Sequence, residues 1–152
     1  MKVSIYSERQ ADIGWHKGGE DISYQGNDIR KDILYSWKTF YTASFTYKFK
    51  YTGDAVFFAY AQPYTYSDLR DDLAVIENNP DRNQYVTTKS LCMTLAGNSC
   101  DYLTITSKSK EPGVTELSKR KGIIITGRVH PGETVGSYMM RGVLDFLTNP
   151  VN

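Results

Sequence analysis

The chain has 152 residues, 40% of them hydrophobic and 23% charged, with a formal net charge of +1. This composition is typical of a globular protein with one ordinary domain or two small ones, and it excludes a disordered chain. The near-neutral charge gives no reason to expect nucleic-acid binding, and no apolar run approaches the roughly 20 residues of a membrane helix. Because residues 1–8 also lack a signal peptide's apolar core, we expect a cytoplasmic protein.

Residues 1–63 have the pattern of β structure. Apolar and polar side chains alternate along Trp37–Phe49, which is typical of a strand with one buried face. The turn Thr52–Asp54 separates this strand from Val56–Tyr60, a second predicted strand in antiparallel pairing with the first. Ile22–Tyr24 lies between glycine-rich breaks and predicts a further short strand. Together these segments predict an antiparallel β-sheet or sandwich domain.

A helix is predicted to begin after Thr65. Thr65 and Asp68 have the three-residue spacing of a capping box, in which each side chain satisfies an amide at the helix start. Apolar residues then recur at helical spacing, and Asn78–Pro80 ends the helix. Because the composition changes from β-like to mixed at this point, we predict one domain over residues 1–63 and a second over residues 64–152.

A β-hairpin is predicted over Val86–Thr106, with a turn that contains glycine. Placing the apolar residues of both strands on one face fixes a register with a three-residue loop. In that register Cys92 lies opposite Thr104 and Cys100 lies opposite Ala96, too far apart for a disulfide. We therefore interpret both cysteines as free structural thiols, with a metal or redox role as the alternative.

The loop Ser107–Arg120 carries a modest surplus of positive charge. Its charged residues are Lys108, Lys110, Lys119 and Arg120 against Glu111 and Glu116. Such a surplus can attract an acidic peptide. The alternative is a solvated insertion loop with no special role.

The carboxyl-terminal part predicts a buried strand followed by a helix. Ile123–Ile125 is strongly apolar. The helix is predicted over Thr134–Leu147, where an apolar stripe comprises Met139, Val143 and Leu147, joined by Met140 and Phe146. We interpret the methionines of this stripe as core residues. An apolar strand leading into a helix is typical of an α/β sheet. This pattern therefore predicts that the second domain is the start of an α/β fold.

The tetrapeptide His130-Pro131-Gly132-Glu133 lies between the predicted strand and helix. A histidine and a glutamate three residues apart at such a junction can aim a nitrogen and an oxygen at one point, and zinc binds both. Open α/β sheets also place their ligands at the carboxyl ends of strands. Two interpretations follow from the residues alone. One is a zinc site with two of its three protein ligands, and the other is a surface histidine beside a helix-capping glutamate.

Motifs that match a known family occur along most of the chain. Gly127–Glu133, continued by Met139–Leu147, forms one such motif, and the others are Phe58–Leu69, the hairpin segments Leu91–Asn98 and Leu103–Thr106, and Gly14–Tyr24. The first resembles the first zinc-binding segment of the cytosolic carboxypeptidases, zinc metallocarboxypeptidases that trim glutamates from tubulin and other proteins. The others are similar to elements of that family's amino-terminal β-domain and of the beginning of its catalytic domain.

The resemblance implies that His130 and Glu133 are zinc ligands. It gives Arg128 a supporting role, with a buried structural partner as the alternative. The family's third zinc ligand, substrate-carboxylate arginine and general-base glutamate lie further downstream and have no match in this chain. His16 belongs to the upstream β-domain, and nothing in its context suggests that it is the missing ligand. The resemblance therefore implies a β-domain followed by the truncated start of an α/β zinc-carboxypeptidase domain, and we expect this chain alone to be inactive.

For the whole protein, the resemblance implies removal of carboxyl-terminal or side-chain glutamates from proteins such as tubulin, with one zinc ion as cofactor. The expected partners are glutamate-rich protein tails, including those of microtubules, and neither nucleic acid nor membrane. The expected location is the cytoplasm, including the cytoskeleton and cilia. The alternative function is a non-catalytic, microtubule-associated or architectural module of the same family.

Overall fold

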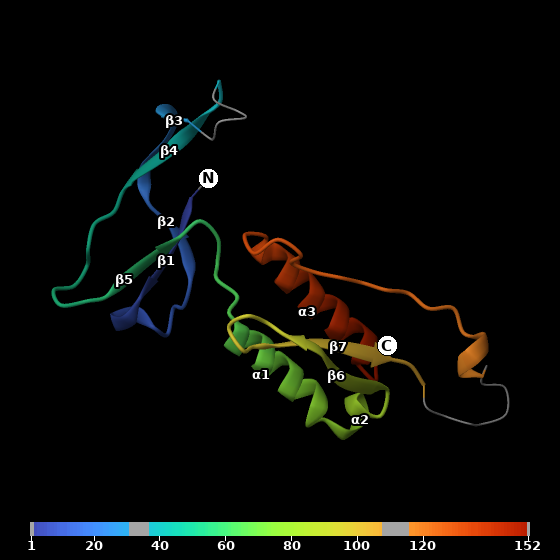
Figure 1. The fold of residues 1–152 in the computed structure, drawn as a ribbon. Coiled ribbons are helices and arrows are strands. Elements are labelled where there is room, and N and C mark those ends of the chain that lie inside the picture. Colours follow the sequence, from blue (N-terminus) through green and yellow to red (C-terminus); the bar gives the residue numbers. More distant parts are fainter. Residues whose placement is uncertain (1, 31–36, 108–115, 152) are drawn as a thin grey trace. The chain divides into compact units, whose positions relative to one another are not determined.

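The computed structural model describes residues 2–30, 37–107 and 116–151 (Figure 1). The chain divides into two compact units, Met1–Pro63 and Tyr64–Asn152. Each unit has its own antiparallel sheets and its own buried side chains. That the first is a β-domain and the second the start of a catalytic domain stays a prediction.

A three-stranded antiparallel sheet forms the core of the first unit. Its order is β2 (His16–Gly18), β1 (Val3–Ser7) and β5 (Val56–Ala59). Ile5 on the central strand is fully buried. A Cβ at Gly18 would stand 2.6 Å from the Ile5 Cδ1 atom, so only glycine lets β2 approach this side chain.

The partner of β5 differs from the prediction, because Val56–Tyr60 was expected to pair with the preceding strand. Instead β5 pairs antiparallel with β1 at the start of the chain. Two contacts favour this pairing. The Ser7 hydroxyl donates to the Asp54 carboxylate at 2.6 Å, and the Tyr6 and Phe57 rings lie 6.3 Å apart between centroids. The Ser7 hydrogen bond also holds the pKa of Asp54 below its usual range.

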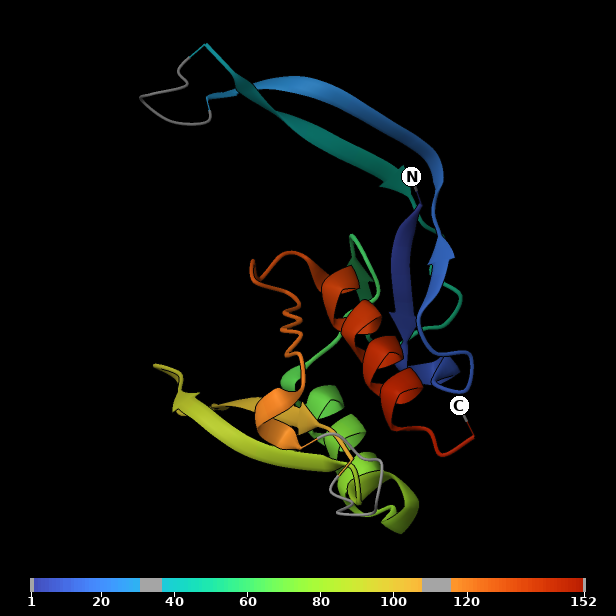
Figure 2. The same cartoon turned by 90° about the vertical axis from the view of Figure 1, so that its right-hand side faces the viewer.

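The other two strands of this unit form an antiparallel ribbon (Figure 2), composed of β3 (Glu20–Arg30) and β4 (Thr39–Thr46). The antiparallel arrangement agrees with the prediction, and β3 is longer than the short strand expected at Ile22–Tyr24. The predicted buried face of Trp37–Phe49 is wrong, because most of β4 is exposed. A two-stranded ribbon has no second layer of its own to bury a face. That the unit forms a sandwich stays a prediction.

Among its described residues, the second unit contains a hairpin and three α-helices. The helices are α1 (Tyr66–Glu77), α2 (Pro80–Asn83) and α3 (Thr134–Thr148), and the hairpin strands are β6 (Val86–Met93) and β7 (Ser99–Ile105). Short 3-10 turns occur at η1 (Glu8–Gln10) in the first unit and at η2 (Leu117–Lys119) in the second. Among the described residues, no helix is long and apolar enough to cross a membrane.

Helix α1 begins as the sequence predicts. The Thr65 hydroxyl accepts from the Asp68 amide at 3.2 Å, and the Asp68 carboxylate accepts from the Thr65 amide at 2.6 Å. This capping box is therefore confirmed. Leu73 and Ile76 are buried, and the helix ends at the predicted asparagine, Asn78.

Helix α2 anchors the carboxyl end of α3. The Arg82 guanidinium donates to the Thr148 hydroxyl at 2.8 and 3.0 Å and pairs with Asp145 at 2.7 Å. Thr148 is almost fully buried, and its hydroxyl in turn donates to the Leu144 carbonyl oxygen at 2.8 Å. A charged donor at a buried hydroxyl makes a comparatively strong hydrogen bond. The far end of α3 is thereby fixed.

The predicted register of the β6–β7 hairpin is wrong. Cys92 pairs with Cys100, not with Thr104, and Ala96 lies in the loop. The turn chemistry explains the difference: the Thr94 amide donates to the Asn98 carbonyl at 2.8 Å, and the glycine before Asn98 has a φ of +78°. A bulge in β6 then shifts the pairing by one residue. Both cysteines are free and exposed.

The predicted strand Ile123–Ile125 is not found among the described residues 116–151. Ile123 is 85% exposed and Ile124 is 93% exposed. A buried strand of an α/β sheet needs a hydrogen-bonding neighbour and covering helices on its faces. Within the described residues this segment has no paired strand, and α3 forms only an open groove with Ile125.

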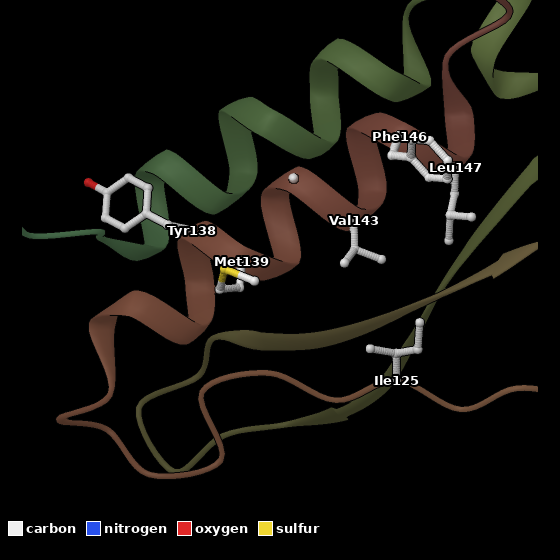
Figure 3. Close-up of a pocket in the computed structure, with 7 residues that line it drawn as sticks. Ile125, Tyr138, Met139, Val143, Phe146 and Leu147 are labelled. Carbon is white, nitrogen blue, oxygen red and sulfur yellow. The ribbon is translucent and has the colours of Figure 1, made fainter. Parts of the chain in front are cut away.

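Met139 of the apolar stripe is not a core residue, which corrects the interpretation of that methionine, whereas Met140 is half-buried and lies close to Gly127. Met139 is 67% exposed, and the buried residues of the helix are Thr134 and Thr148. Met139, Val143, Phe146 and Leu147 line an open apolar groove with Ile125 (Figure 3). Figure 3 shows Val143 pointing from the helix toward the side on which Ile125 lies.

The predicted basic loop is described only in part, because residues 108–115 lie outside the described residues. Its final turn is η2, after which the Arg120 guanidinium donates to the Thr106 hydroxyl at 2.5 Å. Lys119 pairs with Glu116 at 3.2 Å. The attraction of this loop for an acidic peptide stays a prediction.

Candidate metal centre

The predicted ligands lie on a tight turn that leads directly into α3. The Glu133 amide donates to the His130 carbonyl oxygen at 3.0 Å, and the Gly136 amide donates to the Glu133 carbonyl oxygen at 2.9 Å. Pro131 favours such a turn because its ring fixes φ. The chain therefore reverses direction between His130 and Glu133, and both side chains lie on one side of the turn.

The two side chains meet at their donor atoms. His130 Nδ1 lies 2.9 Å from Glu133 Oε1, and the side chains are 77% and 57% exposed. Two ligands of a tetrahedral zinc ion stand roughly 3.3 Å apart, given metal–ligand distances of about 2.0–2.2 Å. The nitrogen and the oxygen therefore fit one ion after a small opening of the pair. Their exposure leaves the site accessible to a substrate.

The alternative interpretation of Glu133 as a helix cap is not supported. Glu133 does occupy the N-cap position of α3, but its side chain makes no capping hydrogen bond. The carboxylate contacts the imidazole instead. A capping carboxylate would accept from the amides of the first helical turn.

Arg128 holds the turn from its amino-terminal side. Its guanidinium donates to the Pro131 carbonyl oxygen at 3.1 Å and to the Tyr64 carbonyl oxygen at 2.6 Å. A longer contact of 3.5 Å reaches the Ser137 hydroxyl in α3. This one side chain therefore connects three segments. They are the turn His130–Glu133, called the metal turn below, the entry to α1 and the first turn of α3. The two carbonyl oxygens are structural partners of Arg128, and its supporting role at a metal site stays a prediction.

The backbone of Arg128 is also unusual. Its φ is +51°, in the left-handed region that non-glycine residues adopt at a cost of roughly 1–2 kcal/mol. Gly136 packs against it so closely that a Cβ there would lie 2.8 Å from the Arg128 amide nitrogen. A Cβ at Gly127 would lie 3.1 Å from the Gly136 carbonyl oxygen. The chain entering the turn is thus held against α3 by close backbone contact.

A buried tyrosine supports the carbonyl that Arg128 contacts. The Tyr64 hydroxyl donates to the Asp72 carboxylate at 2.6 Å, and Arg141 of α3 pairs with the same carboxylate at 3.1 Å. Burial, followed by this hydrogen bond to Asp72, raises the pKa of the Tyr64 phenol well above its usual value. Tyr64 therefore stays neutral, and the Arg141–Asp72 ion pair joins α3 to α1. Sequence reasoning missed Tyr64, Asp72 and Arg141, and no local spacing signals their association.

His130 and Glu133 are two candidate ligands, whereas a catalytic zinc needs three protein ligands. No group of three or more histidine, cysteine, aspartate or glutamate side chains that could hold a metal ion occurs in the described part of the chain. His16 lies in the first unit at the start of β2, where its Nδ1 is 3.1 Å from the Gly14 carbonyl oxygen. The assignment of His130 and Glu133 as zinc ligands and of Arg128 as their support stays a prediction.

Residues 74–151 match the family model of the zinc carboxypeptidases, and the chain belongs to that family. It is 42% identical over 150 residues to cytosolic carboxypeptidase 2 of Xenopus tropicalis, covering 97% of this chain and 15% of that protein. It is 40% identical to cytosolic carboxypeptidase 3 of Mus musculus, covering 97% and 14%. Cytosolic carboxypeptidase 4 of Mus musculus is 36% identical, covering 98% and 14%. The resemblance predicted from the motifs is confirmed.

The chain spans only about 15% of the length of these relatives. The matched region, which begins within α1, includes the hairpin, the metal turn and all of α3. The family is one of zinc enzymes, and the two donor atoms of the metal turn are of the types that zinc binds.

Proposed function

We propose that this chain is the amino-terminal portion of a zinc metallocarboxypeptidase that removes carboxyl-terminal or side-chain glutamates from proteins such as tubulin. The observation that carries the proposal is the 2.9 Å approach of His130 Nδ1 to Glu133 Oε1 on an exposed turn. Membership of the zinc carboxypeptidase family supports a zinc site in the proposal, since residues 74–151 match that family's model. We further propose that residues 64–152 begin an α/β domain.

In the complete protein, His130 and Glu133 would hold the ion, and Arg128 would keep their turn against α3. The chemistry that zinc supplies is Lewis acidity toward a peptide carbonyl and toward water. A third protein ligand, a general base and an arginine for the substrate carboxylate are also needed, and we found no match for them in this chain. We therefore propose that the chain alone is inactive.

The proposed substrates are glutamate-rich protein tails, in the cytoplasm and including the cytoskeleton and cilia. Support for this part comes from the similarity to proteins named cytosolic carboxypeptidases. An arginine that pairs with a terminal carboxylate through two hydrogen bonds explains why such enzymes act at chain ends. No nucleic-acid or membrane partner is proposed.

The test uses the full-length protein and two measurements, bound zinc per protein and glutamate released from an acidic carboxyl-terminal peptide. His130→Ala and Glu133→Gln should each lower both to the level of the chelated protein, because each removes a metal ligand. His16→Ala is the matched control, since it removes the other histidine of this chain from the start of β2 in the first unit. It should leave both measurements unchanged.

The possible outcomes separate the parts of the proposal. Glutamate release that survives both ligand variants would show that the zinc assignment is wrong. Zinc binding that depends on both residues, without glutamate release, would keep the metal centre and reject the substrate. Microtubule binding by a protein that neither binds zinc nor releases glutamate would favour the non-catalytic module.

A further inference from the structure

The β6–β7 hairpin places two free cysteines directly opposite each other. Cys92 pairs with Cys100, and the adjacent pair, Met93 and Ser99, continues the same register. Directly opposed residues of an antiparallel pair project from the same face, with Cα atoms about 4.5 or 5.5 Å apart. Disulfides span Cα distances of about 4.4–6.8 Å. The backbone therefore admits a bridge between these thiols without a change of register.

Both thiols are also accessible. The two cysteines are exposed, and the residues beside Cys100 show which face it occupies. Asp101 pairs with Arg70 of α1 at 2.6 Å, so Asp101 faces the helix. Because neighbouring side chains of a strand point to opposite faces, Cys100 lies on the face away from α1. Its cross-strand partner Cys92 lies on that same open face.

The end of the hairpin is held so that the pair stays opposed. The Asn98 amide donates to the Thr94 hydroxyl at 3.0 Å, in addition to the backbone bond that closes the loop. Across the strands, the Ser99 hydroxyl donates to the Ser90 hydroxyl at 2.8 Å. These bonds resist slippage of one strand against the other. The two sulfur atoms are therefore presented to each other at high effective concentration.

We propose that Cys92 and Cys100 form a reversible disulfide site that reacts with peroxide-class oxidants. One thiol loses its proton, the thiolate attacks a peroxide oxygen, and the O–O bond breaks to give a sulfenic acid and hydroxide, which takes up the released proton to form water. The second thiolate attacks that sulfur and displaces hydroxide, which takes up a proton. In total, two thiols and one hydrogen peroxide give one disulfide and two water molecules. A thiol reductant returns the pair to the free state by exchange.

The bridge would clamp the hairpin end next to the start of α1. The Ser99 amide donates to the Tyr66 hydroxyl at 3.1 Å, which links the strand beside Cys100 to the first residue of that helix. Closing the loop between the cysteines restricts the motion of this end. The site is independent of the metal turn and does not depend on the proposed peptidase activity.

The test treats the full-length protein with hydrogen peroxide and then blocks remaining thiols with an alkylating reagent. Trypsin leaves both cysteines on one peptide, Ser90–Lys108, because no lysine or arginine lies between them. We expect this peptide to lose both alkyl groups and to be two hydrogens lighter than the reduced form. The loss should not depend on protein concentration, and a thiol reductant should restore both alkylations. Cys92→Ser and Cys100→Ser should each prevent the intrapeptide bridge.

A second variant tests the register itself. Cys100→Ser combined with Thr104→Cys moves the second thiol along the same exposed face to the residue that the alternative register places opposite Cys92. In the observed register Thr104 pairs with Thr87, so this variant should form no bridge within the peptide. A bridge in this variant, or two unprotected thiols in the oxidised wild-type protein, would overturn the proposal. Oxidation of the wild-type cysteines to sulfinic acid without a disulfide would also overturn it.

Discussion

Gly136→Ala offers a direct test of how the metal turn is held. Gly136 lies in the first turn of α3, and a Cβ there would stand 2.8 Å from the Arg128 amide nitrogen and 3.3 Å from its Cα. Both atoms belong to Arg128, whose backbone φ is +51° and whose side chain donates to two carbonyl oxygens. The methyl group therefore cannot be accommodated by a simple side-chain rotation. Either the helix start or the segment before His130 must move.

The magnitude follows from two opposing effects. Alanine is favoured over glycine inside a helix by about 1 kcal/mol. Overpacking against fixed neighbours costs about 1–3 kcal/mol. Gly136→Ala should therefore change the free energy of unfolding by between about zero and 2 kcal/mol, in the destabilising direction. Gly142→Ala is the matched control, because nothing lies within 4 Å of its added Cβ and the helix gain of about 1 kcal/mol is kept.

The assay is urea unfolding of both variants and of the wild-type protein, compared at equal slope. Gly142→Ala should unfold at higher urea than Gly136→Ala, with a difference of about 1–3 kcal/mol between the two. Zinc binding to the full-length protein should weaken only in Gly136→Ala, because His130 lies two residues after Arg128. Equal stabilisation by both substitutions would refute the close packing of α3 against the turn.

Three further predictions concern the supports of the site. Arg128→Lys should lower unfolding free energy by about 1–3 kcal/mol, because one ammonium cannot reproduce both guanidinium bonds; unchanged urea midpoints would contradict this. Thr65→Ala should cost about 1 kcal/mol in the same assay through loss of the α1 cap. The hydrogen bond that the Thr65 amide donates to the Asp68 carboxylate lowers the pKa of Asp68 below 3.8. The stability that this carboxylate contributes is therefore present above pH 3.8 and is lost as the pH falls through the lower pKa of the folded state. Asp68→Asn should consequently flatten the acid limb of a pH–stability profile.

Helix ends were predictable because their signals are local. The Thr65 cap bonds to a residue three positions later, and α1 ends where Asn78 precedes a second asparagine and a proline. The short helix α2 carried a similar signal that the prediction missed, with Asn79 accepting from two following amides and proline in the first position. Each of these contacts lies within one turn of chain. The linear sequence therefore contains all the information that is needed to predict these helix ends.

Strand pairing was predicted poorly because its causes are distant in sequence. The neighbour rule assigned β5 to the preceding strand, whereas the Ser7–Asp54 hydrogen bond joins residues 47 positions apart. The hairpin register failed for a different reason. The apolar pattern is expected to fix it, but Leu91, Met93 and Leu95 are all exposed, so burial of these residues does not constrain the register near the loop. The Thr94–Asn98 closure and the bulge set the register instead.

The residues of the candidate site also divide into those that local sequence features predict and those whose contacts are distant in the sequence. His130 and Glu133 were recognisable because their spacing and the intervening proline and glycine are local features. The support from Arg128 was not, because its carbonyl partner at Tyr64 is 64 residues away. Its positive φ is likewise a response to packing against Gly136 and has no signature in the residue type. Only a resemblance to a family singled out this arginine beforehand.

The exposed apolar surface and the proposed metal ligands belong to the same two segments. Ile123–Ile125 leads into the metal turn, and α3, whose apolar stripe lines the groove of Figure 3, begins directly after it. An uncovered surface of this kind marks a place where further protein packs. Covering it would fix both the approach to His130 and the helix that follows Glu133. The geometry of the proposed ligands and the burial of the apolar surface would then be established together. Where metal binding and folding are coupled, metal binding adds to the folding free energy. Zinc should therefore raise the stability of the complete protein.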